Sequence, residues 1–190
     1  MTTKPLAALL AGAVAIAGCS GHAASPPRLA VERARGVTVE LPPGWQRASV
    51  SLTPDLTDPR EVLSVATFPL RYRATRCNHI AGSALEDLGP RDAFVTLLER
   101  GLDPGSTWAG FPPRPAHFGP GLGGPSEASA CVPSAHFTDH WFGFTDGGRH
   151  FHVDVAFGPD APAEVRAEAW GILDSLTVDP RVRPDWQSTG

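Results

Sequence analysis

Long hydrophobic runs and lysine are the two features that this sequence has least of. The longest apolar stretch is the thirteen residues from Leu6 to Gly18, which falls short of the roughly 20 residues that cross a bilayer as a helix. Lys4 is the only lysine, against fifteen arginines, and the formal net charge is −4. The sequence therefore predicts neither a membrane-spanning helix nor the basic surface typical of a nucleic-acid-binding protein.

The N-terminus has the features of an export signal. Residues 1–18 combine one positive charge with the short apolar run, and Ile16-Ala17-Gly18-Cys19 resembles the lipobox of bacterial lipoproteins. This resemblance implies that Cys19 becomes the first residue of the mature chain, carries a diacylglycerol and holds the protein on the extracytoplasmic side of the cell membrane. The alternative is an ordinary secretory signal cleaved near Ala23-Ala24-Ser25, with Cys19 lost in the removed peptide.

Cysteine is scarce as well, with three residues in the chain. If Cys19 carries the lipid, Cys77 and Cys131 remain as one even pair, and an exported domain most simply oxidises such a pair to a disulfide. Closing that long loop is expected to stabilise the fold by roughly 4 kcal/mol through its effect on the unfolded chain. Two buried free thiols are the alternative.

The rest of the sequence predicts one α+β domain over residues 36–180, preceded by a flexible tether at 19–35 and followed by a short tail at 181–190. Val37, Val39 and Leu41 alternate with polar residues, as in a half-buried strand, and Trp45 is expected in the core. The other elements expected are strands at 49–52 and 61–70, a helix at 91–101, a long surface excursion rich in Gly and Pro at 103–134, and a β-hairpin turning at Asp146-Gly147-Gly148.

The hairpin and the last helix have the clearest patterns. On the second hairpin strand the apolar face carries Phe151, Val153, Val155 and Phe157, and the opposite face carries His150, His152 and Asp154. A final helix capped by Asp160 is expected to bury a stripe made of Val165, Ala169, Ile172, Leu173 and Leu176. Such a stripe requires an apolar partner, and the sheet is the nearest one.

Taken together, VTVELPPGW, RDAFVTLLERG and GGRHFHVDVAFG leading into AEAWGILDSLTV resemble the PsbP-like lipoproteins of actinobacteria, including the LpqN type. The resemblance spans roughly Val37 to Val178. It implies an α+β fold in which helices flank an antiparallel sheet, a PsbP-like α/β sandwich, and a role in binding or assembly. It supplies no catalytic residues.

Two groups of residues are candidates for a site. Histidines on the hairpin face offer the donors of a three-ligand zinc or copper site; the candidates are His136, His140, His150 and His152. Compact motifs such as H-E-x-x-H are absent, so solvent or aromatic contacts are the favoured interpretation and no metal is expected. Arg71, Arg73 and Arg76 are candidates for binding an anionic lipid headgroup or glycan, with Arg71 and Arg73 expected on one face of a strand. Solvated arginines are the alternative.

No nucleophile elbow, triad spacing or dinucleotide-binding context is present. We therefore expect a lipid-anchored envelope protein that acts as a non-enzymatic binding or assembly module, with an envelope protein or glycolipid as partner and no cofactor. The alternative is an envelope enzyme or a metal-binding protein that uses the histidine-rich hairpin.

Overall fold

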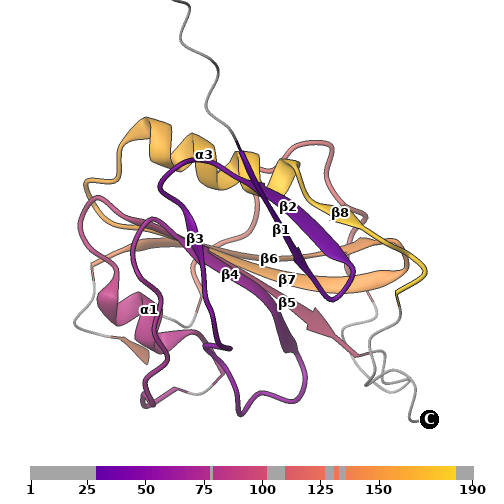
Figure 1. Ribbon diagram of the computed structural model, residues 1–190, viewed down its shortest axis with the longest axis horizontal. Coiled ribbons are helices and arrows are strands. Elements are labelled where there is room, and N and C mark those ends of the chain that lie inside the picture. Colours follow the sequence, from indigo (N-terminus) through magenta and orange to yellow (C-terminus); the bar gives the residue numbers. More distant parts are fainter. Residues whose placement is uncertain (1–28, 78, 102–109, 127–130, 133–135, 183–190) are drawn as a thin grey trace, which may run out of the picture.

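The part of the chain that the structure describes forms two antiparallel sheets together with helices α1 and α3 (Figure 1), which confirms the predicted α+β class. The computed structural model describes residues 29–77, 79–101, 110–126, 131–132 and 136–182. The elements are β1 (Ala30–Ala34), β2 (Val37–Leu41), β3 (Gln46–Arg47), β4 (Arg60–Ala66), α1 (Gly82–Asp87), β5 (Ala93–Arg100), β6 (Thr138–Asp146), β7 (Arg149–Phe157), α3 (Ala163–Asp174) and β8 (Thr177–Val178). The larger sheet has the order β3-β4-β5-β7-β6, and the smaller has the order β1-β2-β8.

The domain begins with a hairpin of β1 and β2. The predicted strand at 37–41 is confirmed, and Trp45 is buried as expected. Because β1 pairs with β2 along its whole length, ordered structure already begins within the segment 19–35 that was expected to be a tether. Arg35 and Gly36 connect the two strands with φ angles of 49° and 74°, which are the two positive φ values of a type I′ hairpin turn.

The expected helix at 91–101 is wrong, because this segment forms β5. The strand lies at the centre of the larger sheet between β4 and β7, and Ala93 to Glu99 are all buried. A strand covered on both faces has no polar side, so its apolar residues run continuously and lose the period-2 signal. The apolar residues of 91–101, whose spacing resembles one face of a helix, therefore lie on both faces of the sheet.

The predicted hairpin of β6 and β7 and the predicted C-terminal helix are both confirmed. Helix α3 buries Ala169, Ile172 and Leu173 against one face of the larger sheet, where β2 and β8 also pack. Asp160 does not cap this helix, since Pro162 occupies the N-cap without a side-chain hydrogen bond. A proline has no side-chain acceptor to offer there, so the stripe of apolar residues, and not capping, holds the helix in place.

A second core covers the opposite face of the larger sheet. Helix α1, which the sequence analysis did not anticipate, places Ala84 and Leu85 against Phe94 and Ala156. The larger sheet is therefore enclosed between α3 on one side and α1 on the other (Figure 1).

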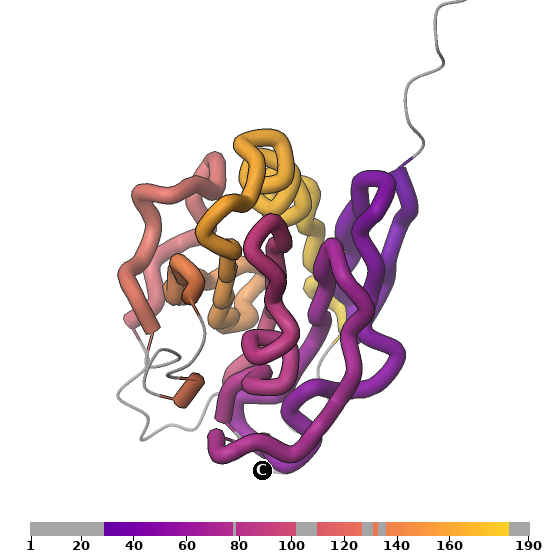
Figure 2. The backbone as a smooth tube through the Cα atoms, turned by 90° about the vertical axis from the view of Figure 1, so that its left-hand side faces the viewer, coloured from indigo at the N-terminus to yellow at the C-terminus, as the bar shows by residue number. Residues whose placement is uncertain are grey.

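Two other expectations differ from the structure. Residues 49–52 form no strand, and the strand expected at 61–70 ends at Ala66. The excursion at 103–134 is described only in part, and its residues 110–126 follow the edge strand β6 through bridges from Pro113 and Gly124. Figure 2 shows this segment and the β1–β2 hairpin at opposite sides of the molecule. An edge covered in this way is closed to pairing with another chain.

The predicted signal peptide and Cys19 lie outside the described residues. Within the described part of the chain, neither helix has the length and apolar character needed to traverse a bilayer.

Candidate functional site

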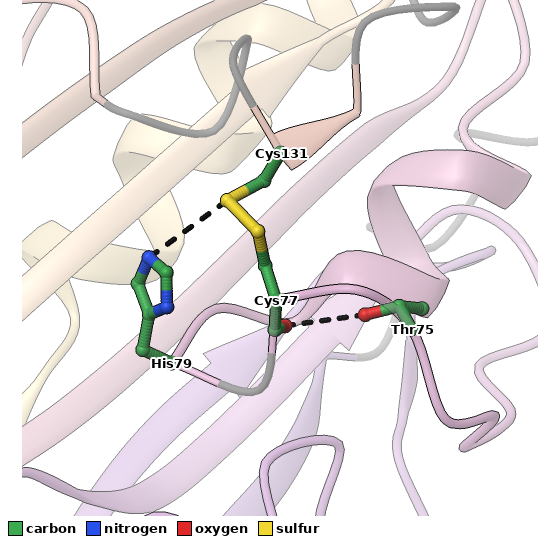
Figure 3. Close-up of a disulfide and its surroundings, with 4 residues drawn as sticks. All are labelled: Thr75, Cys77, His79 and Cys131. Carbon is green, nitrogen blue, oxygen red and sulfur yellow. Dashed lines mark hydrogen bonds between the residues drawn. A yellow bond between two sulfur atoms is a disulfide. The ribbon is translucent and has the colours of Figure 1, made fainter.

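Cys77 and Cys131 form a disulfide, as predicted, across 54 residues of sequence. Both cysteines are half-buried and pack against the second core, and their Cα atoms lie 5.7 Å apart. The imidazole of His79 points at the bridge, with its Nε2 atom 3.8 Å from the Sγ atom of Cys131 (Figure 3). The disulfide ties the segment before α1 to residues 131–132.

The predicted arginine site lies in the irregular segment between β4 and α1. Arg71, Arg73 and Arg76 are all exposed, and no strand holds two of them on one face. Arg73 donates hydrogen bonds to Asp87 at 2.7 Å and to Glu86 at 3.3 Å, and the bond to Asp87 is the main cause of its raised pKa. This pairing with α1 explains Arg73 without a ligand.

The four candidate histidines do not come together. His150 and His152 share one face of β7, as predicted, but His140 pairs with Val155 and therefore lies on the opposite face of the sheet. Its ring centroid is 5.3 Å from that of Trp170, within the first core. His136 is exposed and precedes β6. Among the described residues, the structure therefore brings only two of the four candidates to one face.

His152 is a buried, neutral histidine. Its ring stacks on Trp141 at 4.8 Å and meets the edge of Phe111 at 4.6 Å. Arg100 donates a hydrogen bond from Nε to its Nε2 atom at 2.8 Å, so Nε2 is the acceptor and carries no proton. Burial and the charge of Arg100 lower the pKa of His152 to about 4.

Asp154 is buried beside it and has a pKa shifted in the opposite direction. Its side chain is 2% exposed, and its Oδ1 atom has no hydrogen-bond partner among the described residues. Burial, followed by the charge of Asp139, raises the pKa of Asp154 to about 8. The carboxyl group is therefore held in its neutral form at pH 7, because an isolated buried carboxylate is costly.

A fully buried ion pair crosses the other face of the sheet. Arg149 donates two hydrogen bonds of 2.7 Å, from Nε and Nη2, to the two carboxylate oxygens of Glu99. The guanidinium also lies 5.2 Å from the ring centroid of Phe151. The side chains of Arg149 and Glu99 are 1% and 0% exposed, so we interpret the pair as structural.

A groove lined by arginines is the strongest candidate for a binding site. It consists of two adjoining hollows of about 370 and 170 Å³ that share Arg35, Ser51 and Glu61. Arg60 lines the larger hollow and Arg47 the smaller one. We call this surface the arginine groove. It lies between the β1–β2 turn and the segment 49–57 that precedes β4.

Glu61 shapes the floor of the groove. One of its carboxylate oxygens accepts hydrogen bonds from the backbone N–H groups of Leu52 and Thr53 and from the hydroxyl of Ser51. The other oxygen accepts one from the hydroxyl of Ser64 at 2.6 Å. Both oxygens are therefore used internally, and the other charged residues lining the two hollows are Arg35, Arg47 and Arg60.

The arginines come from three separate elements. Arg35 lies in the β1–β2 turn, Arg47 in β3 and Arg60 at the start of β4. Arg47 donates to the backbone oxygen of Arg33 at 3.1 Å, and Arg60 donates to that of Thr57 at 2.9 Å. Arg47 also forms an ion pair with Glu32, whose carboxylate oxygen lies 3.6 Å from its Nη1 atom.

Sequence analysis missed this groove because its arginines are distant from one another in the chain. One local signal was present: Arg35-Gly36 follows one five-residue strand and precedes another, which is the spacing of a two-residue hairpin turn. Asparagine or glycine occupies the first position of such a turn with less backbone strain than arginine. An arginine at that position therefore suggests that its side chain has a function beyond forming the turn.

No protein-family model matches the chain, and no curated protein sequence matches it.

Proposed function

We propose that this protein is a lipid-anchored binding module of the cell envelope with no catalytic role, and that the arginine groove holds an anionic group of its ligand. The observation that carries this proposal is that Arg35, Arg47 and Arg60 line two adjoining surface hollows, with Arg35 common to both. The larger part, about 370 Å³, falls within the roughly 300–1,000 Å³ of sites that hold small molecules.

The chemistry of the groove favours phosphate or carboxylate. A guanidinium presents a planar set of donors that matches two oxygens of either group. Thr57 adds a hydroxyl group beside the larger hollow, where the hydroxyls of Ser51 and Thr53 donate to Glu61. Val50, which is 55% exposed, and Leu56 add apolar surface beside them. A ligand with an anionic head and an apolar portion, as in an envelope glycolipid, fits this combination.

Two features support the export and anchoring part of the proposal. The apolar run that ends at Cys19 has the arrangement of a lipoprotein signal. The Cys77–Cys131 disulfide is the kind of bond that persists outside the cytoplasm. The groove lies at the turn end of β1, opposite the end at which the chain enters from Cys19. We infer that it is presented away from the anchor.

Crosslinking in intact cells tests the groove directly. A photoreactive amino acid is placed at Val50, on the rim, and in a matched protein at Val31, which is 47% exposed on β1 and away from the groove. We expect an adduct at Val50 that is absent at Val31. The mass of the adduct distinguishes a lipid or glycan from a protein partner.

The arginines are tested in the same cells. Arg35→Gln combined with Arg60→Gln is expected to reduce the Val50 adduct about tenfold or more, since each charged hydrogen bond contributes roughly 1.5–3 kcal/mol. Arg71→Gln, an exposed arginine outside the groove, is the control and should leave the adduct unchanged. An adduct at Val50 that persists in the double variant would contradict the proposed role of the groove.

The anchor is tested by Cys19→Ala. We expect the variant to lose metabolic palmitate labelling and to leave the membrane fraction, because a peripheral domain without its lipid has no comparable membrane affinity. An unchanged membrane fraction would rule out lipidation at Cys19 as the anchor and would leave the groove experiment unaffected.

A further inference from the structure

Three side chains with metal-binding atoms meet at the disulfide. The Sγ atoms of Cys77 and Cys131 and a ring nitrogen of His79 all lie within 4.8 Å of one another. Cys77 and His79 come from the segment before α1, and Cys131 comes from a part of the chain more than 50 residues later. Among the described residues, these three side chains are the cluster whose ligand atoms lie close enough together to hold a metal ion. The cluster includes none of the histidines expected from the sequence.

We propose that reduction of the Cys77–Cys131 disulfide by a dithiol creates a Cys₂His site for a thiophilic divalent cation such as Zn²⁺. While the bridge is intact, neither sulfur is a thiolate, so neither cysteine can bind the cation. The redox state of one bond therefore decides whether the site exists.

The reduction balances with the dithiol as the only co-reactant. A thiolate of the dithiol attacks the sulfur of Cys77, the disulfide breaks, and Cys131 leaves as a thiolate beside His79. The second thiol of the dithiol then attacks the mixed disulfide, so the dithiol ends as a cyclic disulfide and Cys77 is released. The two electrons and two protons of the dithiol are now on the two cysteines. Binding of the cation displaces both protons to solvent.

The distances suit a tetrahedral ion. With metal–sulfur bonds of about 2.3 Å and metal–nitrogen bonds of about 2.0–2.1 Å, a tetrahedral site separates a sulfur from a nitrogen by about 3.6 Å. The Nε2 atom of His79 is already 3.8 Å from the sulfur of Cys131. Figure 3 shows the ring of His79 beside the sulfur of Cys131 in the intact bridge. Once the bond is broken, rotation of the two cysteine side chains moves the sulfurs to the required separation.

The surroundings favour this exchange. Cys77 and Cys131 are half-buried, so an external dithiol has access, and His79 is exposed, which leaves a fourth position to water. Val132, next to Cys131, is buried in the second core. A metal ion would therefore keep the same two segments joined when the covalent link is lost.

Cobalt titration tests the proposal. The purified protein is reduced with dithiothreitol, freed of it by anaerobic gel filtration and titrated with Co²⁺, whose tetrahedral thiolate complexes absorb strongly. We expect one ion per chain and a sulfur-to-cobalt charge-transfer band in the reduced protein, and neither in the oxidised protein. Equal binding in both forms, or none in the reduced form, overturns the proposal.

A matched pair of variants tests the histidine. His79→Ala is expected to weaken Co²⁺ binding by the reduced protein about tenfold or more. Removing a residue that only hydrogen-bonds to a metal ligand already lowers metal affinity roughly 10–100-fold, and His79 is proposed as a ligand itself. His136→Ala removes an exposed histidine outside the group and should bind like the unaltered protein. If His79→Ala binds as tightly as the control, the Cys₂His site is refuted.

Circular dichroism covers the case in which reduction loosens the fold. Zn²⁺ is expected to raise the melting temperature of the reduced protein and to leave that of the oxidised protein unchanged, because an ion that binds only the folded state stabilises it. Reduced protein that melts at the same temperature with and without Zn²⁺ also overturns the proposal. None of these results depends on the arginine groove.

Discussion

The stability of this protein should depend on pH through two neighbouring buried groups that act in opposite directions. Asp154 has its pKa raised from 3.8 to about 8 by burial and by Asp139. His152 has its pKa lowered from 6.5 to about 4 by burial and by Arg100. Substituting Asp154→Asn and His152→Gln separately distinguishes the two contributions, since each replacement keeps a polar side chain of similar size without the titration.

The sign of each contribution follows from which state binds more protons. Between pH 8 and 6.5 the folded protein holds a proton on Asp154 that the unfolded chain lacks, so stability rises as the pH falls. At about 1.4 kcal/mol per pH unit, the gain over this window is about 2 kcal/mol. Between pH 6.5 and 4 the unfolded chain also protonates His152, which the folded state keeps neutral. The loss from His152 then cancels the gain from Asp154.

The unaltered protein should therefore gain stability from pH 8 to 6.5 and then level off. Asp154→Asn should show no rise in the first window and should lose about 3 kcal/mol between pH 6.5 and 4. His152→Gln should keep gaining down to pH 4, by about 5 kcal/mol in all.

Urea unfolding followed by tryptophan fluorescence at pH 8, 6.5 and 4.5 measures these differences. Parallel pH profiles for the two variants would refute the reasoning, and so would an Asp154→Asn protein that retains the rise between pH 8 and 6.5.

Three further predictions concern the framework of the fold. Glu99→Gln leaves the buried Arg149 without its counter-charge and should lower the free energy of unfolding by about 3–5 kcal/mol in urea titrations. Replacing Cys77 and Cys131 by serine together should cost roughly 4 kcal/mol in the same assay, because the bridge closes a loop of 54 residues. Gly158→Ala should cost about 2 kcal/mol or more in thermal unfolding, since its Cβ would lie 2.2 and 2.4 Å from two backbone carbonyl oxygens.

Sequence patterns predicted the elements that have one polar and one apolar side. Strand β2, the β6–β7 hairpin and α3 each expose one face or have a turn signal, so the period of their apolar residues is visible. Strand β5 has neither, because α1 and α3 cover its two faces. Val95 and Thr96 were the available evidence for a strand, since β-branched residues favour extended structure. For a short apolar run, the period of its residues does not distinguish a buried strand from a helix.

Site residues were harder to predict for a related reason. Closeness in sequence suggested Arg71, Arg73 and Arg76, yet these residues lie in an irregular segment and Arg73 is paired with α1. The arginines of the groove are brought together by tertiary packing, which no local pattern encodes. The disulfide could be predicted because only one pair of cysteines remained, whereas the approach of His79 to it depends on the turn before α1.

The two polar regions of the molecule have separate roles because they differ in access to solvent. Arg35 and Arg60 line an open surface hollow between the β1–β2 turn and the start of β4, so a ligand reaches them without disturbing either core. Asp154 and His152 are each 2% exposed beneath the aromatic rings near β6, and their protonation acts on the stability of the whole domain. Substitutions at these two residues should therefore change the pH profile of unfolding while leaving the Val50 adduct in the groove intact. Loss of that adduct in a folded Asp154→Asn protein would show that the two regions are coupled.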